Sequence, residues 1–96
     1  MSGERESQAS SVRRVPASIT AVRLSSANFH RGGFIIHNDS TGVLWGKFGV
    51  GASQTDFTFR VGPQGSFEHR TGRVFRGVIS GVWDTADGAA QVTELL

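Results

Sequence analysis

From residue 17 to its end, this chain repeats one pattern, in which a short apolar run is followed by residues that favour turns. The runs recur at a spacing of roughly 8–12 residues, which is typical of the short strands of a β-sandwich or barrel. Most of the 13 glycines lie between or beside the runs. The pattern predicts an all-β fold, a single small β-sandwich or jelly-roll-like barrel of about seven short antiparallel strands.

The expected strands cover most of this region. We expect the second and third of them to form a core pair around the Asn38–Gly42 turn. Gly81, inside the sixth, indicates a bulge or a close approach of the backbone. A helix is the alternative for residues 84–96, but Gly88 and the β-branched Val92 disfavour it. The apolar runs place the strands at about residues 18–25, 33–38, 43–48, 57–61, 67–70, 74–83 and 91–95.

The composition changes at about Pro16. Residues 1–11 contain no large apolar side chain except Met1, so this segment cannot bury enough surface to offset the entropy of ordering it. We therefore expect residues 1–16 to form an extended N-terminal arm that a neighbouring subunit holds, ahead of a β-sandwich domain at residues 17–96.

The composition also bounds the function. The chain has no cysteine, which excludes disulfides and thiolate chemistry. Its net charge is only +2, and a small excess of arginine with no tyrosine or cysteine to titrate accounts for the high isoelectric point. No apolar run approaches the roughly 20 residues that cross a bilayer. We expect a protein made in a cytoplasm, with neither a membrane nor nucleic acid as its partner.

No residue pattern indicates catalysis. The chain has no GxSxG motif, and its aspartates stand mostly at turns, where carboxylates cap backbone N–H groups. The segment Asp84–Gly88 lacks the ligand spacing of a calcium loop. His30, His37 and His69 are too dispersed to predict a metal site. We expect no enzymatic activity, no catalytic residue, no cofactor and no metal.

Two binding modes remain as alternatives. One is a basic stripe for single-stranded nucleic acid, formed by arginines at positions 60, 70, 73 and 76. The other is a carbohydrate platform of Trp45, Trp83 and Phe48, although strand alternation places both tryptophans in the core.

The order and spacing of several segments resemble a known family. These segments are SITAV at 18–22, RGGFIIHNDS at 31–40, VLWGKFG at 43–49, GAS at 51–53, DFTF at 56–59, ISGVWD at 79–84 and VTEL at 92–95. Together they are similar to small structural proteins of tailed bacteriophages and of prophage-like or gene-transfer particles. The chain departs from that pattern at residues 63–68 and in the arginine-rich segment 70–76.

The resemblance implies a non-enzymatic virion protein, made in the bacterial host, that decorates the capsid or forms the base of a head spike or fibre. A tail or baseplate accessory is the alternative. The implied partners are copies of the same chain, as a trimer or pentamer, and the major capsid protein or another virion protein. The candidate partner-binding residues are Arg13, Arg14, Asn38, Asp39, Ser40, Arg70, Arg73 and Arg76.

Overall fold

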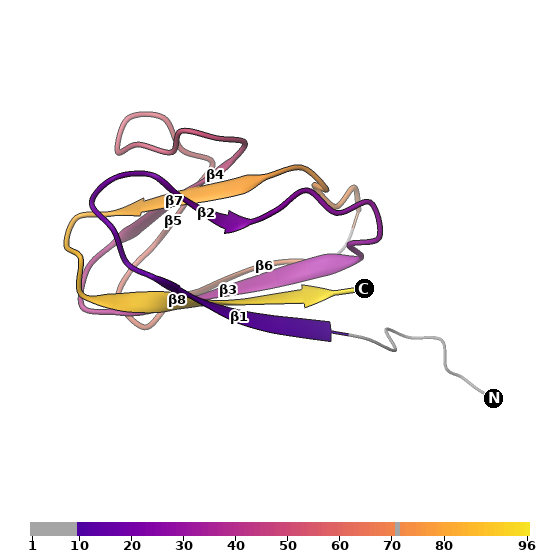
Figure 1. Cartoon of the computed structure of the whole chain (residues 1–96), viewed down its shortest axis with the longest axis horizontal. Helices are drawn as coiled ribbons and strands as arrows, with labels where there is room; N and C mark the ends of the chain where they lie inside the picture. Colours follow the sequence, from indigo (N-terminus) through magenta and orange to yellow (C-terminus); the bar gives the residue numbers. More distant parts are fainter. Residues whose placement is uncertain (1–9, 71) are drawn as a thin grey trace.

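The computed structural model describes residues 10–70 and 72–96, and eight strands account for most of them. Figure 1 shows these strands in two layers. No helix in the described part of the chain is long and apolar enough to cross a membrane. The strands are β1 (Ser10–Pro16), β2 (Val22–Ser25), β3 (Gly33–Ser40), β4 (Leu44–Phe48), β5 (Phe59–Val61), β6 (Ser66–His69), β7 (Ile79–Trp83) and β8 (Gly88–Leu95).

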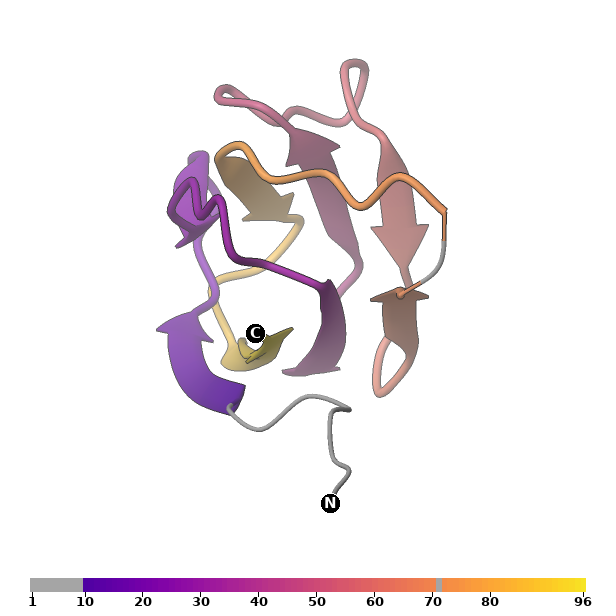
Figure 2. The ribbon, with the colours of Figure 1, turned by 90° about the vertical axis from the view of Figure 1, so that its right-hand side faces the viewer.

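Each layer is a four-stranded sheet. The first sheet has the order β1-β8-β3-β6 and the second has the order β2-β7-β4-β5, and every paired strand is antiparallel to its neighbour. Figure 2, which looks along the strands, shows the two sheets enclosing one interior, with β1 at the margin of the first sheet. The all-β prediction is confirmed, with one strand more than the number expected.

The connection between β3 and β4 differs from the expected core pair. β3 pairs with β8 and β6, whereas β4 pairs with β7 and β5, so the turn after Ser40 carries the chain from one sheet to the other. Two inward-facing polar side chains, Asn38 and Ser40, bond the carbonyl of Gly42 and thereby hold this crossing. Alternation of apolar residues could not distinguish a crossing from a hairpin.

The N-terminal boundary also differs from the expectation. Ser10–Pro16, assigned to the arm, form β1 and pair with β8 of the same chain along their whole length, from Ser10 opposite Leu95 to Pro16 opposite Ala89. Val15 contributes to the core of the domain. The sandwich therefore includes residues that composition assigned to the arm, and residues 1–9 lie outside the described part.

The expected strand at 74–83 is shorter in the structure, where β7 begins at Ile79. The carbonyls of Phe75 and Gly77 accept hydrogen bonds from the Arg31 side chain instead of joining a ladder. Residues 88–95 form a strand and not a helix. Gly88, at a φ of 92°, starts that strand, and a Cβ there would lie 2.4 Å from the Asp39 carbonyl oxygen.

Inward-facing side chains of both sheets form one apolar core. Trp83, 1% exposed, is among the largest buried side chains, which confirms its predicted core position. Phenylalanine rings stack in two pairs: Phe59 on Phe67 with centroids 4.2 Å apart, and Phe48 on Phe75 at 4.7 Å. Because Phe59 belongs to the second sheet and Phe67 to the first, this stack joins the sheets on the β5–β6 side.

Gly81 is the close backbone approach that its position in a strand indicated. A Cβ there would lie 2.8 Å from Leu24 Cδ1 and 2.9 Å from Leu44 Cδ1. Such distances are too short for carbon atoms, so the two leucines can meet over β7 only because position 81 carries no side chain.

Candidate interaction surface

The most buried charged group in the described chain is Arg31, which is 0% exposed. Its guanidinium contacts the Glu94 carboxylate, Nε to Oε2 at 2.7 Å, and its charge is paired there. The remaining donors bond groups on two other segments of the chain, residues 25–26 and 75–77. These are Ser25 Oγ at 3.1 Å and the carbonyls of Ser26, Phe75 and Gly77 at 2.6, 2.7 and 3.0 Å.

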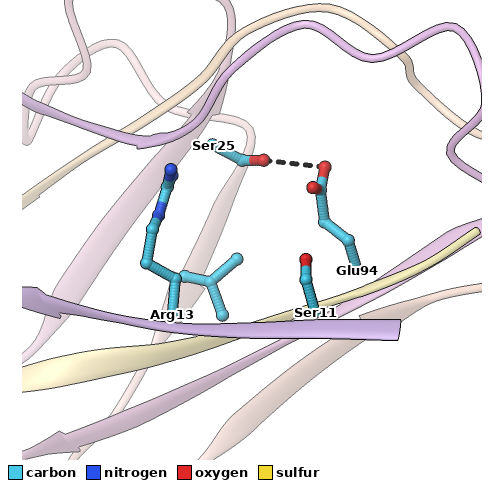
Figure 3. A pocket seen from close by; sticks show the side chains of 5 residues that line it. Ser11, Arg13, Ser25 and Glu94 are labelled. Carbon is cyan, nitrogen blue, oxygen red and sulfur yellow. Dashed lines mark hydrogen bonds between the residues drawn. The ribbon is translucent and has the colours of Figure 1, made fainter. Parts of the chain in front are cut away.

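A small cavity of about 40 Å³ lies beside this ion pair, between β1, β2 and β8. Figure 3 shows Ser11 and Arg13 pointing from β1 toward Ser25 and Glu94. The Ser25 hydroxyl donates to Glu94 Oε2 at 2.8 Å, and the Arg13 side chain donates to the Leu24 carbonyl. The cavity has room for water but not for an organic substrate.

The charge state of Glu94 argues against acid–base catalysis here. Burial raises the pKa of Glu94, but hydrogen bonds from Arg31 and Ser25 outweigh burial and leave the pKa below its usual value. A general acid or base works best with a pKa near the working pH. A carboxylate that stays ionised and bound to a buried guanidinium instead holds the chain segments together.

A second buried polar cluster surrounds Asn38. Its Oδ1 accepts from Trp83 Nε1 at 3.0 Å and from Ser40 Oγ at 2.7 Å. Its Nδ2 faces the carbonyls of Gly42, Val61 and Gly62 at 2.9–3.0 Å. Asn38 and Ser40, named as partner-binding residues from sequence, are therefore buried in the fold, and their side chains are not on the surface.

The outer face of the first sheet has a centre without Lys, Arg, Asp or Glu. Cross-strand register places Val12, Thr93 and Ile35 in one row and Arg14, Gln91 and His37 in the next. Val12 is 62% exposed, and Ile35, Thr93, Gln91 and His37 are half-buried. We call the residues of these two rows, Arg14 excepted, the flat face; they are Val12, Ile35, His37, Gln91 and Thr93.

Charged residues border the flat face and pair among themselves. Arg14 Nη1 lies 3.0 Å from Asp39 Oδ2, and Arg70 Nε lies 3.5 Å from Glu68 Oε1. Hydrogen bonds from Arg14 and Gln64 hold the pKa of Asp39 below its usual value. The surface therefore has a centre without Lys, Arg, Asp or Glu and a rim of paired charges, as the core and polar rim of an interface do.

The flat face continues into a free sheet edge. The Ala17 N–H donates to the Gly88 carbonyl at 2.9 Å, and this pair continues the β1–β8 register. In an antiparallel ladder, alternate residues direct their N–H and C=O groups to opposite sides of the strand. Odd-numbered β1 residues therefore bond β8, while Ser10, Val12 and Arg14 present theirs to the edge, where no described strand pairs with them.

The predicted arginine stripe is not assembled in the described structure. Arg60 lies on β5 of the second sheet, opposite Trp45, whereas Arg70 follows β6 of the first sheet. Arg73 and Arg76 are exposed in the connection to β7, and Arg76 Nε donates to the Arg31 carbonyl at 3.1 Å.

The three-ring platform is also not formed. Trp83 is buried, and the Phe48 ring packs in the core against Phe34 and Phe75. Trp45 was expected in the core, but it is half-buried on the outer face of the second sheet, in register with Arg60 and Val82. Alternation misplaced it because both faces of β4 carry large side chains.

Sequence reasoning missed several exposed apolar side chains in the connections. Phe29 is 88% exposed beside a hollow of about 120 Å³ that Arg76 also lines. Val50 is 71% exposed at the rim of a hollow of about 210 Å³. Ile19 is 65% exposed, although its run was assigned to a strand interior.

The histidines are separated in space. His37 Nδ1 lies 2.9 Å from Ser66 Oγ on the flat-face side, and His69 Nε2 lies 3.0 Å from the Arg73 carbonyl. Within residues 10–70 and 72–96, no group of three or more His, Asp or Glu side chains is arranged to hold a metal ion.

Comparisons with protein-family models, with curated proteins and with solved structures found no significant match.

Proposed function

We propose that this chain is a non-enzymatic structural protein of a phage-type particle, which attaches to the particle surface and to copies of itself. The observation that carries the proposal is the flat face, a patch without Lys, Arg, Asp or Glu that runs into an edge of β1 with which no described strand pairs. A patch of this kind suits protein–protein contact, since charged residues are depleted at the centres of interfaces.

The internal polar groups are consistent with this role. The most buried ones, Arg31 and Asn38, have their donors directed at carbonyls and side chains of the fold itself. The cavity described beside the Arg31–Glu94 pair, about 40 Å³, has no room for an organic substrate. A rigid scaffold with its polar chemistry used internally suits attachment better than turnover.

Within a particle, we favour the head, as capsid decoration or the base of a spike or fibre, over a tail or baseplate position. This part of the proposal rests on the resemblance of segments such as RGGFIIHNDS and ISGVWD to those of phage structural proteins. The surface geometry supports attachment in either place.

Cosedimentation with particles that lack the protein tests the proposal. Ile35→Glu places an unpaired charge at the centre of the flat face and should weaken binding at least about tenfold. Gln54→Glu adds the same charge in the connection between β4 and β5, and should bind as the unaltered chain does. Circular dichroism checks that both variants fold. Equal binding by the two variants, or no binding of the unaltered chain, refutes the proposal.

A second candidate is a stacking site at Trp45, which the exposed Arg60 borders. An aromatic ring beside an arginine can stack on a sugar or a nucleobase. Titration of Trp45 fluorescence with oligosaccharides and with single-stranded DNA tests it, and Trp45→Phe identifies which indole responds. Salt-dependent quenching by DNA would favour the nucleic-acid mode, and an unchanged signal with both ligands excludes the site.

A further inference from the structure

The free edge of β1 differs from ordinary sheet edges in how its charges are placed. Natural edge strands commonly carry charged side chains that discourage pairing with another chain. Arg13 and Arg14 are the charged residues of β1, and the side chains of both bond groups of the same domain. Arg13 turns inward to the Leu24 carbonyl, and Arg14 lies across the outer face against Asp39 and Gln91. The edge itself is left uncovered by either arginine.

The backbone of this edge is complete where pairing needs it. Ser10, Val12 and Arg14 direct their N–H and C=O groups outward, as the β1–β8 ladder requires. Pro16 is the next residue whose backbone faces outward. Because proline has no N–H, the series of outward donors ends at Arg14. The edge therefore offers a short, regular run of donors and acceptors over residues 10–14.

We infer that β1 pairs with β1 of a second copy, antiparallel and centred on Val12, so that two first sheets join into one continuous sheet. The inference rests on the proposed function, because it names the self-contact of that attachment protein. This pairing gives about six backbone hydrogen bonds, two from each of the facing pairs Ser10–Arg14, Val12–Val12 and Arg14–Ser10.

The charges on β1 exclude the register centred on Arg13, and the length of β1 disfavours the register centred on Ser11, in which Ser10 and Val12 are the only β1 residues whose outward groups pair within the strand. With Val12 opposite Val12 of the second copy, Arg13 faces Ser11 and Arg14 faces Ser10, so no two arginines oppose each other. The next register that keeps the hydrogen-bonding pattern, shifted by one residue per strand, places Arg13 opposite Arg13. Like charges directly across a strand pair are destabilising. Val12, exposed in one copy, becomes covered by its own counterpart.

The occupant is a second copy because the edge is complementary to itself about a twofold axis. Such a contact uses the same patch on both partners and closes at two copies. It also doubles the flat face, since the outer faces of both sheets become one surface. The trimer or pentamer that the resemblance implies would instead need a contact between two different patches. For the β1 edge of one copy, the β6 edge at the other side of the first sheet is the available second patch.

Proline substitutions at the two edges of the first sheet test the inference. Val12→Pro removes an outward N–H of β1 without removing a bond of the β1–β8 ladder. Glu68→Pro makes the equivalent change on β6, because Asn38 N–H bonds the Gly65 carbonyl and alternation turns the Glu68 N–H outward. Sedimentation velocity over a range of concentrations should show dimers for the unaltered chain and Glu68→Pro, and monomers for Val12→Pro.

Cysteine cross-linking tests the register independently, because the chain has no cysteine of its own. Val12→Cys should form a disulfide-linked dimer on mild oxidation, and Glu68→Cys should not. A monomeric unaltered chain, a Val12→Pro dimer, or association lost only in Glu68→Pro overturns the inference. Particle binding by an unaltered chain that is monomeric in solution would overturn the inference and leave particle attachment intact, so the two ideas fail separately.

Discussion

Replacing Arg31 by methionine tests how this sandwich is held together at the end where β7 begins. Methionine keeps much of the side-chain volume but removes the charge and every donor. The change leaves the Glu94 carboxylate without its guanidinium partner, 2.7 Å away, and removes one donor from each of three carbonyls. Glu94 keeps its bond from Ser25 and is partly exposed, which limits the loss.

The expected cost follows from these contacts. Breaking a buried ion pair by removing one partner costs about 3–5 kcal/mol. A domain of this size has a total stability of roughly 5–15 kcal/mol, so the variant should be folded but marginal. Its melting temperature should fall by roughly 15–30 °C.

Urea unfolding followed by tryptophan fluorescence measures the loss, and the slope of the transition shows whether two-state behaviour persists. Arg23→Met is the matched control, because Arg23 is an exposed arginine on β2 whose side chain, among the described residues, bonds Ser26 at 3.4 Å. That control should stay within about 0.5 kcal/mol of the unaltered chain. A loss below about 1 kcal/mol for Arg31→Met would show that packing, and not the guanidinium, holds the segment before β7.

Three further predictions concern other parts of the core. Asn38→Ala removes the acceptor of the Trp83 indole N–H and a donor to the Val61 carbonyl, and should cost about 3 kcal/mol in urea unfolding. Glu94 has a folded pKa below its unfolded value of about 4.3. Its stabilisation is therefore present above that value and lost as the pH falls through the folded pKa, so Glu94→Gln should lose less stability than the unaltered chain between pH 7 and pH 3. Gly81→Ala should cost about 1–3 kcal/mol by overpacking, whereas Gly62→Ala, with open space around its Cβ, should cost less than about 1 kcal/mol.

The strands that the sequence located best are those with regular alternation and a turn at each end. β3 and β6 lie within two residues of the expected ranges: the apolar run of β3 lies between Gly33 and the Asn38–Gly42 turn segment, and in β6 Phe67 alternates with polar residues. The segment 74–78 was misassigned because its composition is strand-like while its carbonyls bond Arg31, which is more than 40 residues away in sequence. Local propensity contains no information about such a partner.

The candidate site was only partly accessible from sequence. Arg14 was selected as a residue of the arm and Asp39 as a residue of an exposed turn, and the two lie together at the rim of the flat face. Asn38 and Ser40 were selected for the same reason, because an Asn-Asp-Ser segment is typical of exposed turns. Tertiary structure instead buries both around the Trp83 indole. The polar side chain and its partner come from distant strands, so only the fold determines whether the pair meets.

By itself, the sequence determined the class of fold, since two-residue periodicity and closely spaced turns are local properties that short strands require. It also placed Trp83 in the core. The tertiary structure decided which strands pair, that Ser10–Pro16 belong to a sheet, and which face and edge remain open. These features depend on contacts between residues far apart in the chain. Which strand lies at an edge is decided only by the pairing of all the other strands.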